Sequence, residues 1–253
     1  MTDPAPQRVL ITGGARGIGA GLAAAFAADG GAVGLIGLDA GRLARAAEQL
    51  EVTAAAVIWR AADVGDRERL QRAVDEIAGE LGGLDVLVNN AGLARWVRID
   101  TPLAAAEQLW DEVLTTNLKG AFLASLTAIP HLAQPGGRII NISSVTAFLG
   151  GHGGSIAYAT SKAGLHGLTY ALVRELSPLG ITVNAVAPGF IEDTDFNSDF
   201  PAAARAQVIQ ETPLGRAGTV ADVVAAVRYL ASPTASFVTG EVMHVNGGRI
   251  FGR

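Results

Sequence analysis

The chain has 253 residues, with 24 acidic against 19 basic side chains and no cysteine. Without cysteine, disulfides, thiolate catalysis and cysteine-ligated metal sites are excluded, and the mildly acidic charge argues against nucleic acid as the main partner. The first residues are polar and no apolar run reaches membrane-spanning length, so we expect a cytoplasmic protein without a membrane partner.

Short β-branched segments alternate with longer stretches rich in alanine and leucine. Strands are expected at 9–12, 32–36, 56–60, 86–89, 138–142, 182–187 and 241–245. Helices are expected at 17–29, 42–50, 66–81, 104–133, 158–177 and 220–230. Such alternation implies right-handed crossovers, and therefore an α/β fold with a doubly wound parallel sheet of seven strands and helices on both faces. No linker or shift in composition divides the chain, which predicts a single domain over 1–253.

A glycine-rich turn joins the first expected strand to the first expected helix. Its glycines are Gly13, Gly17 and Gly19, after the last strand residue Thr12. Backbone N–H groups and the helix dipole face an anion at such a turn, and glycine lets the backbone come close to it. The position favours a dinucleotide site over a flexible loop that merely starts a helix.

The end of the second expected strand discriminates between NAD(H) and NADP(H). An acid there binds the ribose hydroxyls of NAD, whereas a basic residue favours the 2′-phosphate of NADP. Gly37 and Leu38 occupy the discriminating positions, and Asp39 falls just beyond them, where it is also a candidate cap of the next helix. Arg16 in the glycine turn suits a 2′-phosphate. Both cofactors stay open, with a slight preference for NADP(H).

Tyr158 and Lys162 lie four residues apart in an expected helix, so they share one face. A free tyrosine has a pKa near ~10 and exchanges protons poorly at neutral pH. A nearby ammonium favours the phenolate, so we expect Lys162 to lower the pKa of Tyr158 toward neutrality, where acid–base catalysis is efficient.

Together with these residues, Asn89-Asn90-Ala91-Gly92, Asn117, Pro188-Gly189 and Val245-Asn246-Gly247-Gly248 complete an ordered set of motifs. In this order the chain resembles the short-chain dehydrogenase/reductase family over nearly its whole length, which implies a Rossmann-like fold. The resemblance implies cofactor contacts by Gly13, Ala15, Arg16, Gly17, Ile18, Gly19, Leu38, Asp39, Asp63, Val64, Asn90, Ala91, Gly92, Tyr158, Lys162, Pro188, Gly189 and Ile191.

The same resemblance implies the catalytic residues Asn117, Ser144, Tyr158 and Lys162. Tyr158 is expected to act as general acid or base, Ser144 to hold the substrate oxygen, and Asn117 to support the lysine through a water molecule. Ser143 competes with Ser144 for its role. The separation of Ser144 from Tyr158 is one residue longer than the commonest family pattern, so the loop between them is expected to have a different shape.

The longest irregular stretch, 190–213, is expected to be a substrate lid with a short helix at 202–210. Candidate pocket walls, each of which suits core or interface packing equally well, are Ala94, Trp96, Val145, Leu149, His152, Phe190, Phe196 and Phe200. No metal is expected, because the four histidines lack ligand spacing and the acidic run from Asp193 lacks the glycine and glutamate of a calcium loop.

The sequence therefore predicts an oxidoreductase that transfers a hydride between NAD(P)(H) and a ketone or secondary alcohol, as a carbonyl reductase or alcohol dehydrogenase. A 3-oxoacyl-thioester reductase is the alternative. The segment 133–137 is neutral, which favours a free small ketone, sugar or ring alcohol over a substrate on an acidic carrier protein. A non-catalytic cofactor-binding regulator is a remote second class. The resemblance also implies a homotetramer that pairs through 104–133, 158–177 and 220–230.

Overall fold

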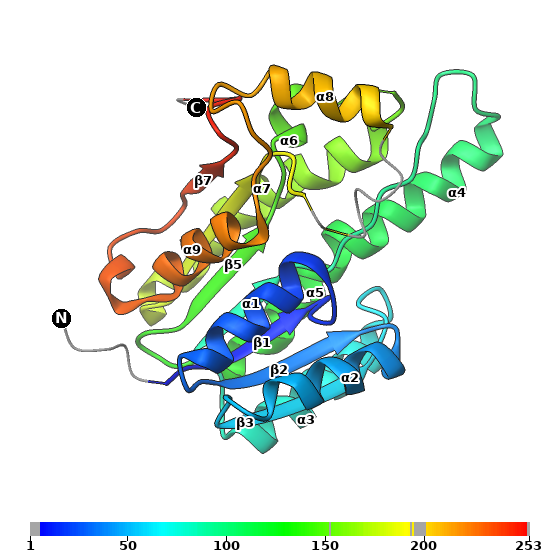
Figure 1. Cartoon of the computed structure of the whole chain (residues 1–253). Helices are drawn as coiled ribbons and strands as arrows, with labels where there is room; N and C mark the ends of the chain where they lie inside the picture. The colour runs from blue at the N-terminus through cyan, green and yellow to red at the C-terminus, as the bar shows by residue number, and fades with distance from the viewer. Residues whose placement is uncertain (1–5, 152, 193, 195–200, 252–253) are drawn as a thin grey trace.

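The computed structural model describes residues 6–151, 153–192, 194 and 201–251. Within them, the strands are β1 Arg8–Thr12, β2 Ala32–Gly37, β3 Ala56–Ala61, β4 Val86–Asn89, β5 Arg138–Ile142, β6 Thr182–Pro188 and β7 Val242–Val245. They form one parallel sheet in the order β3-β2-β1-β4-β5-β6-β7 (Figure 1). The predicted seven-stranded, doubly wound α/β sheet is confirmed.

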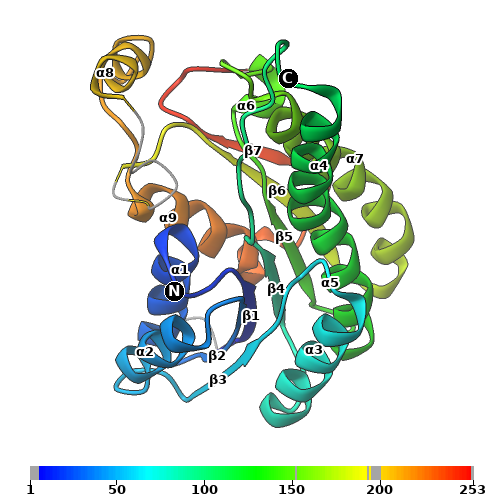
Figure 2. The ribbon, with the colours of Figure 1, turned by 90° about the vertical axis from the view of Figure 1, so that its right-hand side faces the viewer.

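Helices cover both faces of this sheet. The α-helices are α1 Gly17–Ala28, α2 Ala40–Leu50, α3 Arg67–Leu81, α4 Leu103–Leu114, α5 Gly120–Ala128, α6 Thr146–Leu149, α7 Ile156–Leu176, α8 Ala202–Gln210 and α9 Val220–Ala231. Figure 2 shows α1, α2 and α9 on one side of the strands and α3, α4, α5 and α7 on the other. No helix in the described ranges is long and apolar enough to cross a membrane.

The strands are apolar on both faces because each face carries a hydrophobic core. Leu10 contributes to the core under α3, α5 and α7, and its neighbour Ile11 contributes to the core under α1, α2 and α9. In β5, Ile139 contributes to the same core as Leu10, and Ile140 to the same core as Ile11. All four side chains are fully buried. Consecutive strand side chains point to opposite faces, so a run of large aliphatic residues fills both layers.

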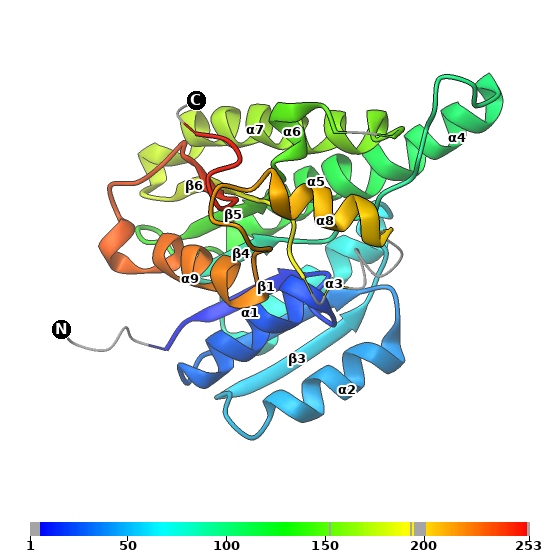
Figure 3. The same cartoon turned by 45° about the horizontal axis from the view of Figure 1, so that its top comes forward.

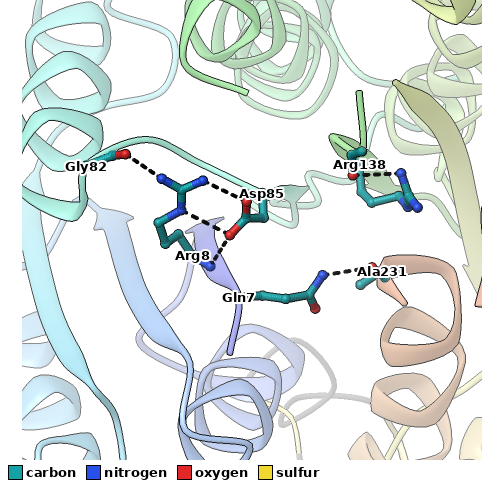
Figure 4. A network of polar contacts seen from close by, with 7 residues as sticks. Gln7, Arg8, Gly82, Asp85, Arg138 and Ala231 are labelled. Carbon is teal, nitrogen blue, oxygen red and sulfur yellow. Dashed lines mark hydrogen bonds and ion pairs between the residues drawn. The ribbon is translucent and has the colours of Figure 1, made fainter. Parts of the chain in front are cut away.

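Polar contacts join the starts of β1, β4 and β5 at the N-terminal edge of the sheet (Figure 4). The Arg8 guanidinium donates to both carboxylate oxygens of Asp85, at 2.8 and 3.0 Å. Gln7 Nε2 donates to the Ala231 carbonyl at 2.9 Å, which ties the end of α9 to the same edge. Arg138 is buried and donates to the carbonyls of the two glycines that precede it. These contacts hold the N-terminal edge of the sheet together, and this edge lies opposite the C-terminal ends of the strands.

The helix expected over 104–133 is present as one continuous helical run over 103–131, but its hydrogen-bond pattern changes along its length. The chain forms α4, then a π-helical turn at Thr115–Lys119, then α5, and ends in a 3₁₀ turn at Ile129–His131. Gly120 lets this widened turn lie against Val64, because a Cβ at Gly120 would stand 2.6 Å from a Val64 methyl carbon. Pro130 then ends the helix.

The loops and short helices after the strands gather at one end of the molecule. The short helix α6 follows β5 and was not expected, whereas α8 has the expected bounds. Figure 1 shows α6 and α8 at the same end, and Figure 3 turns that end toward the reader. Residues 193 and 195–200 of the expected lid lie outside the described residues, so a lid stays a prediction.

Candidate active site

The glycine turn after β1 is closely packed. Gly13 has a φ of 66°, and a Cβ on it would stand 2.9 Å from the Ala91 Cα. A Cβ on Gly19 would stand only 2.2 Å from the Gly13 carbonyl oxygen. These glycines are therefore required for the turn to sit this close to the N-terminus of α1, whose positive end suits a phosphate.

Asn90 fastens the loop after β4 to this turn. Its Nδ2 donates to the carbonyls of Thr12 and Gly13, at 3.1 and 3.0 Å. The Thr12 hydroxyl in return accepts from the backbone N–H groups of Asn90 and Ala91. Because β1 and β4 flank the point where strand order reverses, these contacts shape the crevice in which such sheets bind nucleotides.

The next loops supply the side chains expected near the adenosine. Asp39 caps α2: its Oδ1 accepts from the Arg42 N–H at 2.9 Å, and this bond lowers the pKa of the Asp39 carboxyl. Leu38 is exposed beside it. After β3, Asp63 is exposed and accepts from the Gly65 N–H, whereas Val64 is buried against the Gly120 turn. The end of β2 is therefore followed by the exposed apolar side chain of Leu38. The carboxylate of Asp39, the next residue, is engaged in capping α2.

Ser144 and Tyr158 are hydrogen-bonded through their hydroxyl groups. Ser144 follows β5 and also accepts from the Thr146 N–H at 3.1 Å, whereas Tyr158 lies in the first turn of α7. Ser143 does not compete for this position, because its hydroxyl points to the Lys162 carbonyl and to His166. The structure thus places Ser144, and not Ser143, against the tyrosine.

Lys162 is buried beneath the tyrosine. Its ammonium donates to the Ile142 carbonyl at 2.7 Å and lies 5.8 Å from the centre of the Tyr158 ring. Gly92 lies beside it, since a Cβ there would stand 3.4 Å from Nζ, an ordinary contact distance. Burial lowers the pKa of Lys162 to about 8.

The expectation that Lys162 lowers the pKa of Tyr158 was wrong, because the pKa is raised instead. Burial raises the pKa of Tyr158 to about 12, and the hydrogen bond with Ser144 opposes the rise without reversing it. The lysine cation is directed to the Ile142 carbonyl rather than to the phenol oxygen, so it does not offset the lost hydration. The phenol therefore keeps its proton throughout the neutral range.

Asn117 lies in the π-helical turn and is buried. Its amide exchanges two hydrogen bonds with the Leu93 backbone, at 2.8 and 2.9 Å, and donates to the Ser161 hydroxyl at 3.0 Å. A Cβ on Gly92 would stand 3.5 Å from the Asn117 Oδ1 and 3.4 Å from the Lys162 Nζ, so both side chains lie beside this glycine. Single-turn π-helices are frequent at functional sites, and this one brings Asn117 beside the lysine. The water that was expected between them stays a prediction.

Two further segments close the site. Pro188 ends β6 and its carbonyl accepts from Val145 N–H at 2.8 Å, while Gly189 lies so close to Asn246 that a Cβ would stand 2.9 Å from its Cα. Ile191 is buried and its backbone bridges to Gly218. These contacts hold the segments that follow β5, β6 and β7 against one another at the side of the site.

The expected pocket residues are only partly brought together. The Val97 N–H donates to the Gly154 carbonyl at 2.8 Å, so the loop that holds Ala94 and Trp96 lies against the loop before Tyr158. Trp96 is 54% exposed, Ala94 is half-buried and Val145 is buried. Phe190 is half-buried beside the wall. His152, Phe196 and Phe200 lie outside the described residues.

Sequence reasoning missed His166, which contacts Ser143, because nothing in its spacing marks a site. Among the described residues, no group of three or more histidine, aspartate or glutamate side chains is arranged to hold a metal ion. The site thus combines a proton-carrying phenol, a hydroxyl and a buried cation beside the glycine turn.

Comparisons with known proteins find relatives over nearly the whole chain. A family model described as enoyl-(acyl carrier protein) reductase matches residues 13–249. The 3-oxoacyl-(acyl-carrier-protein) reductase FabG of Aquifex aeolicus is 40% identical over 245 residues, which cover 94% of this chain and 95% of the relative. The corresponding protein of Thermotoga maritima is 37% identical over 242 residues, covering 95% and 96%.

Solved structures give the same result. A short-chain dehydrogenase of Burkholderia cenocepacia in complex with NADP is 37% identical, with a TM-score of 0.89 over 96% of this chain and 97% of that one. A mutant of Serratia marcescens short-chain dehydrogenase/reductase is 35% identical, with a TM-score of 0.89 over 97% of this chain and 99% of that one.

Proposed function

The chain belongs to the short-chain dehydrogenase/reductase family, and on that premise we propose that Tyr158, Ser144 and Lys162 carry its reaction. The protein is an oxidoreductase that transfers a hydride between NAD(P)(H) and a ketone or secondary alcohol. The observation that supports the assignment is the Ser144–Tyr158 hydrogen bond above a buried lysine, next to the glycine turn. The turn fits a dinucleotide, because Gly13 and Gly19 leave no room for a Cβ.

The nicotinamide supplies or accepts the hydride when it is bound, and the protein supplies position, a proton and electrostatics. Ser144 orients the carbonyl oxygen and Tyr158 gives it a proton. Because burial raises the pKa of Tyr158 to about 12, the phenol carries its proton at neutral pH and can donate it to a ketone oxygen.

Ser144→Ala is expected to lower kcat by about 10²-fold, because it removes one donor to the developing oxyanion. The cofactor dissociation constant should stay near the wild-type value, since Ser144 bonds to Tyr158 and to the Thr146 backbone. Steady-state kinetics and a fluorescence titration with reduced cofactor measure the two quantities. An unchanged kcat would remove Ser144 from the proposal.

Two substrate classes are proposed for the ketone. The first is a free small ketone. The second is a 3-oxoacyl thioester, which is favoured by relatives of 37–40% identity whose names state that activity. The neutral segment 133–137 does not weigh against it, because it precedes β5 and so lies with Arg138 at the N-terminal edge of the sheet (Figure 4). Ser144, which bonds to Tyr158, follows the C-terminal end of β5. Consumption of reduced nicotinamide with acetoacetyl-CoA and with a panel of free ketones, compared by kcat/KM, decides between them.

We propose NADP(H) as the preferred cofactor. Asp39 caps α2 and pairs with Arg42 at 3.5 Å, while Leu38 stands exposed at the ribose position. The solved Burkholderia cenocepacia relative is a complex with NADP. A carboxylate at the end of the second strand favours NAD(H), so Leu38→Asp should shift the ratio of dissociation constants toward NADH by about tenfold. Tighter binding of NADH than of NADPH by the wild type would contradict the proposal.

A homotetramer and a cytosolic location complete the proposal. An apolar groove on α4, α5 and α7, which is open to solvent, supports pairing with a second copy; it is lined by Leu114, Thr115, Leu118, Lys119, Phe122 and Leu168. Exposed Tyr229 and Phe237, in and after α9, support a second contact. Light scattering on a sizing column measures the assembly, and a monomer would contradict it.

A further inference from the structure

A small aromatic cluster lies behind Ser144, and the proposed reaction does not use it. It consists of Phe148 in α6, His166 in α7 and His244 in β7. The Phe148 ring packs between the two imidazoles, with its centroid 4.8 Å from each. His166 follows Lys162 by four residues, which places both side chains on the same face of α7.

The imidazole of His166 is hydrogen-bonded to Ser143. Its Nε2 lies 2.7 Å from the Ser143 hydroxyl oxygen, and that hydroxyl donates to the Lys162 carbonyl at 3.0 Å. A hydroxyl has one proton. Because Ser143 directs it to the carbonyl, the Ser143 oxygen accepts the Nε2–H of His166, which fixes the tautomer of the imidazole.

Ser143 stands between the two groups that hold the reacting side chains. On one side, the Ile142 carbonyl accepts the Lys162 ammonium at 2.7 Å. On the other side, the Ser144 hydroxyl bonds Tyr158. The Ser143 N–H donates to the Val186 carbonyl at 2.7 Å, so its backbone is held by β6 and its side chain by α7. A displacement of Ser143 therefore moves the partners of Tyr158 and Lys162 together.

We propose that His166 is a positioning residue: it holds Ser143, and through Ser143 it fixes the end of β5 that carries Ser144 and the Ile142 carbonyl. The proposal rests on the proposed function of Tyr158 and Ser144. Polar networks outside the reacting groups set the geometry of those groups, and displacements below 1 Å change rates strongly.

His244 provides a matched control in the same cluster. It packs on the same Phe148 ring, but its Nδ1 faces Asn246 Nδ2 at 3.5 Å, and its buried Nε2 has no hydrogen-bond partner in the described part of the chain. In the described part of the chain, no hydrogen bond joins His244 to Ser143. Replacement of His244 therefore changes the packing of the cluster without touching the path from α7 to β5.

The experiment measures kcat, ketone KM and the cofactor dissociation constant for the wild type and for His166→Leu, Ser143→Ala, the double variant and His244→Leu. His166→Leu is expected to lower kcat by about 10- to 100-fold with little change in cofactor binding. The double variant should be no slower than the slower single variant, because both changes break one path. His244→Leu should keep kcat within about threefold.

A conservative pair keeps the test decisive if His166→Leu fails to fold. Glutamine at this position carries an N–H donor that reaches Ser143, whereas asparagine is too short, so His166→Gln should recover kcat and His166→Asn should not. Multiplicative effects in the double variant, a kcat of His166→Leu within about twofold of the wild type, or equal rates for the two amides would overturn the proposal. An inactive wild type that binds cofactor would instead overturn the proposed function.

Discussion

Tyr158→Phe is expected to lower kcat for ketone reduction by roughly 10²- to 10⁴-fold, the usual contribution of a positioned general acid. The change deletes one hydroxyl and its hydrogen bond with Ser144, and leaves the ring where it packs beside Val97, Val113 and Ala157. The loss should therefore fall on kcat, while the cofactor dissociation constant stays close to the wild-type value. Steady-state kinetics, a cofactor titration and a thermal melt measure these three quantities.

The control for this variant is Tyr170→Phe, which removes an exposed phenol further along α7. It should leave kcat unchanged, because the phenol lies three helical turns from the site. A Tyr158→Phe enzyme with kcat within about threefold of the wild type would show that the proton comes from elsewhere.

Lys162→Met should weaken cofactor binding and lower kcat/KM by about 10²-fold or more. Methionine keeps most of the packing volume, so the change isolates the loss of the ammonium and of its bond to the Ile142 carbonyl. The cation is lost at the position between Gly92 and Tyr158, two residues that are expected to contact the cofactor.

The pH dependence of this variant follows from the lowered lysine pKa. Since burial lowers the pKa of Lys162 to about 8, the ammonium is present below that pH and is lost as the pH rises through it. The wild-type kcat/KM should therefore fall above about pH 8, and Lys162→Met should lack this decline. Tyr158, with a pKa of about 12, does not contribute to the decline. Persistence of the same decline in Lys162→Met would assign it to another group.

The fold follows closely from the sequence pattern, because the central strands are apolar runs that are buried on both faces, as β1, β4, β5 and β6 are. The π-helical turn between α4 and α5 could not be predicted, since it has no residue signature and depends on Val64 fitting against Gly120. Helix propensity favours a continuous helix through Thr115–Lys119, and the chain does stay helical there; packing changes only the hydrogen-bond pattern.

The sequence could propose the site where a motif names both residue type and spacing, as for Tyr158 and Lys162. It left Ser143 and Ser144 as rivals, and only the contact with Tyr158 separates them. The site was not predictable where the result depends on burial or on distant contacts. The pKa of Tyr158 depends on how much water the loops after β4 and β5 exclude, and on where the Lys162 ammonium points. The contact of His166 with Ser143 joins residues 23 apart, and no local pattern encodes it.

The most direct test is a single-turnover experiment in which the protein, preloaded with reduced nicotinamide, is mixed with the best ketone of the panel. Single turnover isolates the chemical step from product release. We expect rapid, ketone-dependent loss of nicotinamide absorbance in the wild type and a burst slower by roughly 10²-fold or more in Tyr158→Phe. Equal bursts in the two proteins, or no oxidation of bound cofactor with any ketone or 3-oxoacyl thioester, would contradict it.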